Sequence, residues 1–186
     1  PAPARLSRTL RSPVLCPPRI RLFVSSSAAF PHSPLPPMPE RIDPEPGQES
    51  VWDYPRPPVI DKAETTIYAY LGNTLVMQSN RALRILETAG APVYCAPRED
   101  WNLDLLEANG EYSVCEWKGV ATQYDVKAEG KVAKWGAFSY DEPLTDLGQV
   151  YEQLAGCIAP HPAKLTCYLG DEKAEPQPGG MYAGWV

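Results

Sequence analysis

The stretch Thr66-Ile-Tyr-Ala-Tyr-Leu-Gly-Asn-Thr-Leu-Val-Met77 decides the fold class of this 186-residue chain. Two runs rich in β-branched and aromatic residues flank Gly72-Asn73, and a residue pair of this kind between such runs predicts a tight β-hairpin. Further along, Glu129-Gly130 separates two more alternating runs. The sequence therefore predicts a mainly β protein, a single compact domain of short antiparallel strands.

The rest of the body is predicted as further short strands and two short helices. Strands are expected over residues 93–96, 102–106, 111–118, 120–127, 131–140, 157–159 and 163–169. Helices are expected over Asn80–Thr88 and Asp146–Ala155, because each has an apolar stripe, a polar capping residue before it and a glycine after it. In the first helix Arg81, Arg84 and Glu87 would share the polar face.

The chain is expected to have three parts. Residues 1–37 contain nine prolines, five arginines and no Asp or Glu, which predicts a disordered leader outside the fold. This leader is either an organelle transit peptide, for a mitochondrion or plastid, or translated sequence upstream of an initiator Met38. The missing first methionine favours the second alternative and a cytoplasmic protein. Residues 38–60 form a proline-rich arm, anchored by Trp52 and Tyr54, and residues 61–186 form the β domain.

Composition argues against several partners and cofactors. Removing the five leader arginines from 17 Lys and Arg leaves 12, against 23 Asp and Glu, so residues 38–186 carry a net charge of -11. An acidic body of this kind disfavours nucleic acid. The longest apolar runs are far shorter than the roughly 18 residues of a membrane helix, so no membrane partner is expected. The five scattered cysteines form no close pairs, which predicts free thiols and no zinc site.

Three segments far apart in the chain share a high density of Trp, Tyr, Pro and Gly. They are Glu49–Pro58, Cys115-Glu-Trp-Lys-Gly119 and Pro176–Trp185. Together with Arg81-Ala-Leu-Arg-Ile-Leu-Glu-Thr88, and with Val93-Tyr94 followed by Glu99-Asp100, they make the chain resemble domain of unknown function family 427, from Gln48 to the last residue. The resemblance implies a tent-like β fold of the Mss4-like group. Many members of that group hold zinc through paired cysteines, which this chain lacks.

These segments supply the candidate site residues. Polar and aromatic side chains in combination are typical of small-ligand pockets, and the candidates here are Trp52, Tyr54, Arg84, Glu87, Tyr94, Glu116, Trp117 and Lys118. Strand alternation would place Glu116 and Lys118 on one face. Structural alternatives stay open, since Glu116 and Lys118 can form a cross-strand ion pair and Arg84 can tie down the arm.

Three functions are compatible with these residues. The leading hypothesis is a domain that binds a small polar or aromatic molecule, with any catalytic residue or cofactor unassigned. The second is a protein–protein interaction module, and the third is nucleotidyl transfer. The third needs closely spaced carboxylates for Mg²⁺ and a phosphate cradle, and the sequence contains neither pattern. The oligomeric state is not defined by the sequence.

Overall fold

The computed structural model describes residues 43–144, 151–180 and 182–186. The chain divides into two units, Pro1–Pro39 and Glu40–Val186, and every described residue belongs to the second. The predicted leader, residues 1–37, therefore lies outside the described residues. No helix with the length and apolar composition of a membrane span occurs in the described part of the chain.

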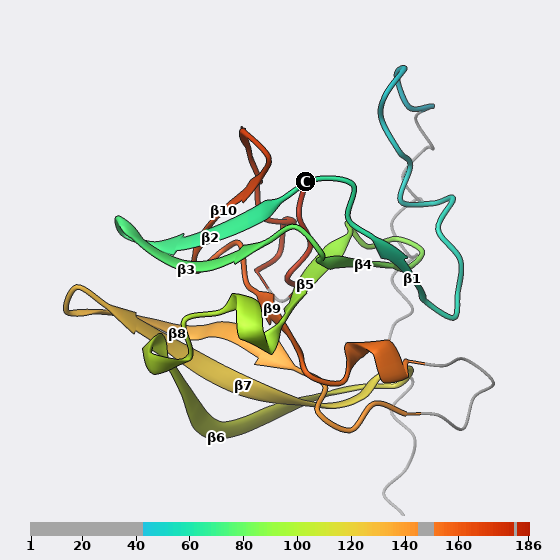
Figure 1. The fold of residues 1–186 in the computed structure, drawn as a ribbon. Helices are drawn as coiled ribbons and strands as arrows, with labels where there is room; N and C mark the ends of the chain where they lie inside the picture. The colour runs from blue at the N-terminus through green and yellow to red at the C-terminus, as the bar shows by residue number, and fades with distance from the viewer. Residues whose placement is uncertain (1–42, 145–150, 181) are drawn as a thin grey trace, which may run out of the picture. The chain divides into compact units, whose positions relative to one another are not determined.

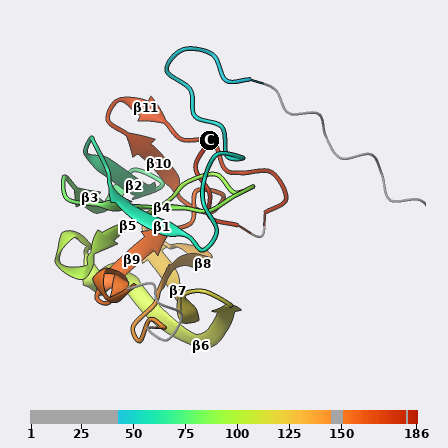
Figure 2. The same ribbon diagram turned by 90° about the vertical axis from the view of Figure 1, so that its right-hand side faces the viewer.

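Two antiparallel sheets build the domain (Figure 1). The larger sheet has the strand order β1-β4-β5-β9-β8-β7-β6. Its strands are β1 (Val59–Lys62), β4 (Leu83–Leu86), β5 (Val93–Pro97), β6 (Leu106–Cys115), β7 (Gly119–Ala128), β8 (Lys131–Ser139) and β9 (Cys157–Pro160). The smaller sheet, in the order β11-β10-β2-β3, contains β2 (Ile67–Leu71), β3 (Thr74–Ser79), β10 (Thr166–Leu169) and β11 (Glu172–Lys173). In Figure 2 the strands β11, β10, β2 and β3 of the smaller sheet lie above the strands β9, β7 and β6 of the larger sheet. The prediction of a mainly β, antiparallel fold is confirmed.

The two hairpins predicted from their turn residues are present. Leu71 pairs with Thr74 across the first turn, in which Gly72 has a φ of 64°. Ala128 pairs with Lys131 across a turn in which Glu129 and Gly130 have φ values of 51° and 73°. Two consecutive residues with positive φ form the turn type whose twist matches that of the flanking strands.

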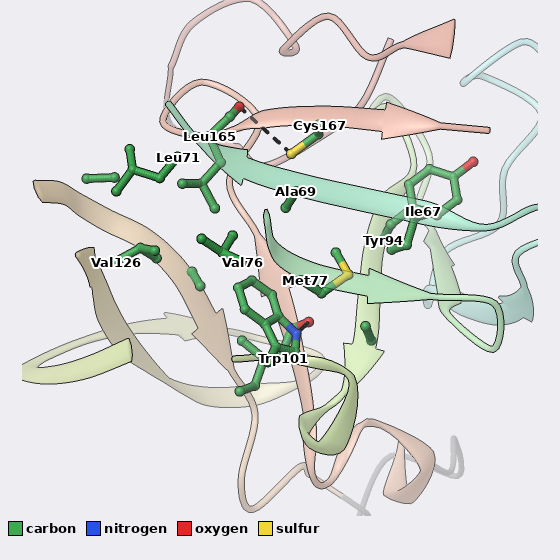
Figure 3. Close-up of a cluster of buried hydrophobic side chains, with 14 of the residues drawn as sticks. Ile67, Ala69, Leu71, Val76, Met77, Tyr94, Trp101, Val126, Leu165 and Cys167 are labelled. Carbon is green, nitrogen blue, oxygen red and sulfur yellow. Dashed lines mark hydrogen bonds between the residues drawn. The ribbon is translucent and has the colours of Figure 1, made fainter. Parts of the chain in front are cut away.

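The main core lies between the two sheets (Figure 3). Strand β2 alternates, so Ile67, Ala69 and Leu71 are buried while Tyr68 and Tyr70 are only partly covered. Trp101 lies beside Met77 and Val76 in this core and belongs to the loop between the short 3-10 turns η1 (Arg98–Asp100) and η2 (Leu103–Leu105). A second apolar cluster, around Tyr151 and Leu154, packs elsewhere against the larger sheet.

The helix predicted over Asn80–Thr88 is wrong, since the segment contains strand β4. Leu83, Arg84 and Ile85 pair with β1 on one side and with β5 on the other. Leu83 and Ile85 pack into the second cluster, so the apolar residues also fit a two-residue period. Pairing on both edges overrides the intrinsic helix preference of a short segment. The polar helix face predicted for Arg81, Arg84 and Glu87 does not exist.

Other predicted boundaries also change. Residues 146–150 of the second predicted helix lie outside the described residues, and its end contains only a 3-10 turn, η3 (Glu152–Leu154). The strand predicted over residues 102–106 is instead η2 followed by the start of β6. Strand β6 ends at Cys115, and the next three residues form the turn into β7.

Candidate functional site

The tryptophan- and proline-rich segments converge on β4 and the loop that follows it. Arg56 of the arm forms an ion pair with Glu87, at 3.0 Å between Nη2 and Oε1. The hydroxyl of Thr88 donates a hydrogen bond to the carbonyl of Tyr54. Near the C-terminus, Gln177 accepts a hydrogen bond from the backbone N–H of Ala91 at 2.9 Å. Segments separated by more than 100 residues therefore meet around one short strand.

Arg84 is the centre of the first polar cluster, and it holds the arm through Glu49. Its Nη2 atom lies 2.9 and 2.8 Å from the two carboxylate oxygens of Glu49. The hydroxyl of Tyr54 donates to the same carboxylate at 2.6 Å. The Arg84 side chain is 16% exposed and that of Glu49 is 53% exposed. A partly buried cation is thus neutralised by a carboxylate at the surface.

The protonation of this cluster follows from those contacts. The hydrogen bonds from Arg84 and then from Tyr54 lower the pKa of Glu49. Burial opposes the charge on Arg84, but the hydrogen bond and the negative charge of Glu49 outweigh it and raise the arginine pKa. Burial, followed by the bond to Glu49, raises the pKa of Tyr54 far above its ordinary range. At neutral pH the cluster is a carboxylate, a guanidinium and a neutral phenol.

Two aromatic rings complete the first cluster. Tyr94 of β5 is directly opposite Arg84 of β4 in the sheet register. The centroids of the Tyr94 and Trp185 rings lie 4.8 Å apart, and the angle between the two ring planes is 46°. Arg84 Nε and Trp185 Nε1 are buried without a hydrogen-bond partner among the described residues. Unpartnered buried donors are rare in proteins and call for an explanation, such as a water molecule or a ligand.

Lys118 is the centre of a second polar cluster. Its Nζ atom lies 3.3 Å from Oε2 of Glu87, and the lysine side chain is only 10% exposed. Burial raises the pKa of Tyr140, and the nearby Cys115 and Glu87 act in the same direction. The indole N–H of Trp117 is buried, with no partner in the described part of the chain. Glu87 therefore connects two segments. It pairs with Arg56 of the arm and with Lys118 of the β6–β7 turn.

Six of the eight predicted residues belong to the two clusters. Tyr54, Arg84 and Tyr94 belong to the first cluster, and Glu87, Trp117 and Lys118 to the second. The core assignments show that they lie on opposite faces of the sheet, because Tyr94 belongs to the main core while Ile85 and Cys95 belong to the second. Trp52 is 43% exposed in the arm. The structure therefore brings the predicted residues together in two clusters rather than in one.

Glu116 does not share a strand face with Lys118. Both residues are in the turn between β6 and β7, where Glu116 is exposed and Lys118 is buried. The counter-ion of Lys118 is Glu87, which is 31 residues away in sequence. The structural alternative for Arg84, a tie to the arm, is the contact observed. Sequence reasoning missed Glu49 as its partner, although Glu49 stands in the same motif as Trp52 and Tyr54.

Two hollows are present in the described structure. A cavity of about 10 Å³ lies within the second apolar cluster, lined in part by Cys95, Tyr140 and Cys157. A more open groove of about 590 Å³ lies over β2 and β10. Its lining residues are Tyr68, Tyr70, Gly72, Asn73, Thr166, Tyr168, Gly170 and Asp171. No group of three or more His, Cys, Asp or Glu side chains that could hold a metal ion occurs among the described residues.

The fold and the two clusters define a two-sheet antiparallel β domain in which strand β4, next to the edge strand β1, anchors an N-terminal arm. The chain belongs to the family described as a Domain of unknown function (DUF427), which it matches over residues 59–169, more than half of its length. This confirms the family resemblance. Glu49 and Trp185 of the first cluster lie outside the matched range, and Arg84 and Tyr94 lie within it. Among curated proteins, no sequence matches this chain.

Acid is expected to release the arm from Arg84. The pKa of Glu49 is lowered from its ordinary value of 4.5 by the hydrogen bonds from Arg84 and Tyr54. The stabilisation is therefore fully present above the unfolded-state pKa and is lost as pH falls through the lower folded-state value. Amide protection of residues 49–56, measured by hydrogen exchange from pH 6 to pH 3, should fall in this window. An identical fall in Glu49→Gln would contradict the assignment.

Proposed function

We propose that the domain binds a small molecule carrying a carboxylate, which takes the place of Glu49 on Arg84. The observation that supports the proposal is the pairing of a partly buried guanidinium with a surface carboxylate from the arm. Arginine presents a planar fork of donors that matches a carboxylate, and Glu49 already fills this position from within the chain. A competing ligand would replace one carboxylate with another at the same place.

The surroundings of Arg84 indicate the rest of the ligand. Tyr54 offers a hydroxyl donor that now binds Glu49. Tyr94 and Trp185 form a tilted aromatic pair, and the unpartnered N–H groups of Arg84 and Trp185 can donate to further acceptor atoms. Aromatic walls with a few polar groups are typical of small-molecule sites. These features fit an aromatic or planar carboxylate better than a purely aliphatic one.

The proposal predicts opposite effects for the two partners of the ion pair. Glu49→Gln removes the internal competitor, so benzoate should bind more tightly than to the wild type. Arg84→Gln removes the receiving cation, so benzoate should no longer raise the melting temperature. At a concentration ten times the dissociation constant, the expected stabilisation is about 1.4 kcal/mol. The measurement is a thermal-shift titration of the wild type and both variants, with benzamide as the uncharged control ligand.

Two results would overturn this site. Equal loss of the benzoate response in Glu49→Gln and Arg84→Gln would make Glu49 part of the binding site rather than a competitor. Loss of the response in Tyr168→Ala, with Arg84→Gln unaffected, would move the ligand to the tyrosine-lined groove over β2 and β10. If benzamide raised the melting temperature as much as benzoate, the carboxylate would not contribute to binding.

A protein–protein interface is a second candidate function, favoured by edge strand β6. Tyr112 and Val114 on this strand are 70% and 78% exposed, and Val120, opposite Val114 on β7, is 53% exposed. An exposed edge with apolar side chains is a template for pairing with another chain. We propose that a second copy of this chain pairs there. Light scattering should then show a concentration-dependent dimer that Val114→Lys abolishes, and a monomer at all concentrations would refute it.

Nucleotidyl transfer, the third function compatible with the sequence, has no supporting observation in the described residues. The cytoplasmic location also stays a prediction. The four described cysteines, Cys95, Cys115, Cys157 and Cys167, carry free thiols, and this fits a reducing compartment.

A further inference from the structure

Two cysteines that take no part in the proposed carboxylate site lie together on neighbouring strands. Strand β5 pairs antiparallel with β9, with Ala96 opposite Ile158 and Pro97 opposite Cys157. Cys95 is two residues before Pro97, so its side chain points to the same face as that of Cys157. The two thiols are therefore diagonal neighbours, whose Cα atoms lie roughly 7–8 Å apart in a regular sheet, so a disulfide between them needs a small backbone shift.

The packing brings the two sulfur atoms into one enclosed space. Cys95 and Cys157 are 3% and 8% exposed, and both line the cavity of about 10 Å³. The thiol of Cys157 also donates a hydrogen bond to the carbonyl of Gln153, with 3.5 Å between the heavy atoms. Most of the remaining lining is apolar, including Ile85, Leu154 and Ala159. A small void beside the sulfurs leaves room for the shift that a shorter sulfur–sulfur distance requires.

The two thiols differ in acidity in the way a reactive pair requires. The neighbouring Cys95 side chain lowers the pKa of Cys157 against burial and the negative charge of Glu99, and the charge of Arg81 acts in the same direction as Cys95. The contact with Cys157, followed by burial, raises the pKa of Cys95. Since the thiolate is the nucleophile, Cys157 is the group to react first and Cys95 the group to resolve the product. By contrast, burial raises the pKa of Cys167 to about 12.

We propose that Cys95 and Cys157 form a reversible intramolecular disulfide when the protein meets hydrogen peroxide. The Cys157 thiolate attacks one peroxide oxygen, the O–O bond breaks, and the departing hydroxide takes a proton to become water, leaving a sulfenic acid. The sulfur of Cys95 then attacks this sulfenic sulfur. The S–S bond forms, the S–O bond breaks, and hydroxide leaves with the Cys95 proton as a second water. Two electrons pass from the thiols to the peroxide.

The disulfide would be a covalent cross-link between β5 and β9. These strands join the β1-β4-β5 part of the larger sheet to the β8-β7-β6 part. The bond would enclose a loop of more than 60 residues in sequence, and a cross-link of this span restricts the unfolded chain strongly. Oxidation is therefore expected to raise the melting temperature, whereas oxidation to a sulfinic acid in the same buried place would lower it.

The test is oxidation of the folded full chain by hydrogen peroxide, followed by mass spectrometry. Cys16 lies outside the described residues and is replaced by Ser in every sample, so that it cannot exchange with the pair. The expected products are a chain lighter by about 2 Da, the two hydrogen atoms lost in forming a disulfide, a cross-linked peptide containing Cys95 and Cys157, and recovery of both thiols with dithiothreitol. Cys95→Ser should instead trap Cys157 as a sulfenic or sulfinic acid.

Matched variants separate the pair from the other thiols. Cys157→Ser should slow the peroxide reaction at least tenfold, whereas Cys115→Ser and Cys167→Ser should leave both rate and product unchanged. Circular dichroism of each variant confirms folding before oxidation. If the pair stays reduced while Cys115 is oxidised, or if the cross-link forms only in urea, the proposal is wrong. A wild-type rate equal to that of Cys157→Ser would also overturn it.

Discussion

Trp101→Ala is expected to lower the free energy of unfolding by about 4 kcal/mol, the range for removing a buried tryptophan. Trp101 is 5% exposed and pairs by an isolated backbone bridge with Met77 of β3. Its indole Nε1 donates to the carbonyl of Ile158 on β9 at 3.3 Å. The indole lies beside Met77 and Val76 of the smaller sheet (Figure 3), and its bond to Ile158 reaches the larger sheet. Its removal leaves a cavity where the two layers meet.

Thermal unfolding monitored by circular dichroism measures this effect. A loss of 4 kcal/mol corresponds to a melting temperature lower by roughly 8–16 °C for a domain of this size. Trp101→Phe is the matched control. It keeps most of the apolar volume but loses the bond to Ile158, so it should cost only about 1–2 kcal/mol. Equal destabilisation by both variants would mean that the hydrogen bond, and not the filled volume, carries the effect.

Glu87→Gln is expected to cost about 3 kcal/mol, because it leaves a buried lysine without its counter-ion. The Lys118 side chain is 10% exposed, and Glu87 is the carboxylate that pairs with it. The amide of glutamine keeps the size of the side chain and one acceptor oxygen but not the charge. Urea unfolding of the variant, compared with the wild type, gives the cost.

Two further variants show whether the stranded lysine is the cause. The double variant Glu87→Gln with Lys118→Met removes both charges and should recover most of the lost stability. Arg56→Ala breaks only the exposed part of the network, since the Arg56 side chain is 56% exposed, and should cost less than 1 kcal/mol. A double variant as unstable as Glu87→Gln alone would contradict the role assigned to Lys118.

Local chemistry in the sequence was sufficient for the hairpins and the fold class. The turns at Gly72-Asn73 and Glu129-Gly130 need positive φ values, which glycine adopts more readily than other residues. The runs beside both turns alternate with a two-residue period. Because these signals depend only on neighbouring residues, the β2–β3 and β7–β8 hairpins follow from the sequence. Three of the segments that carry the family resemblance, Glu49–Pro58, Cys115–Gly119 and Pro176–Trp185, also stand out in the sequence by their density of Trp, Tyr, Pro and Gly.

Only the tertiary structure decided the identity of β4 and the partners of the charged side chains. The residues from Ala82 to Ala89 fit a helical period, and Leu83 and Ile85 also fit an extended one. The pairing with β1 and β5, which are distant in sequence, selects the strand. This choice places Arg84 beside Glu49 and Tyr94 on one face, and the β6–β7 turn places Lys118 beside Glu87 on the other. An ion pair between residues 31 or 35 positions apart depends on how the strands pack, and the residues next to each partner in the sequence do not determine it.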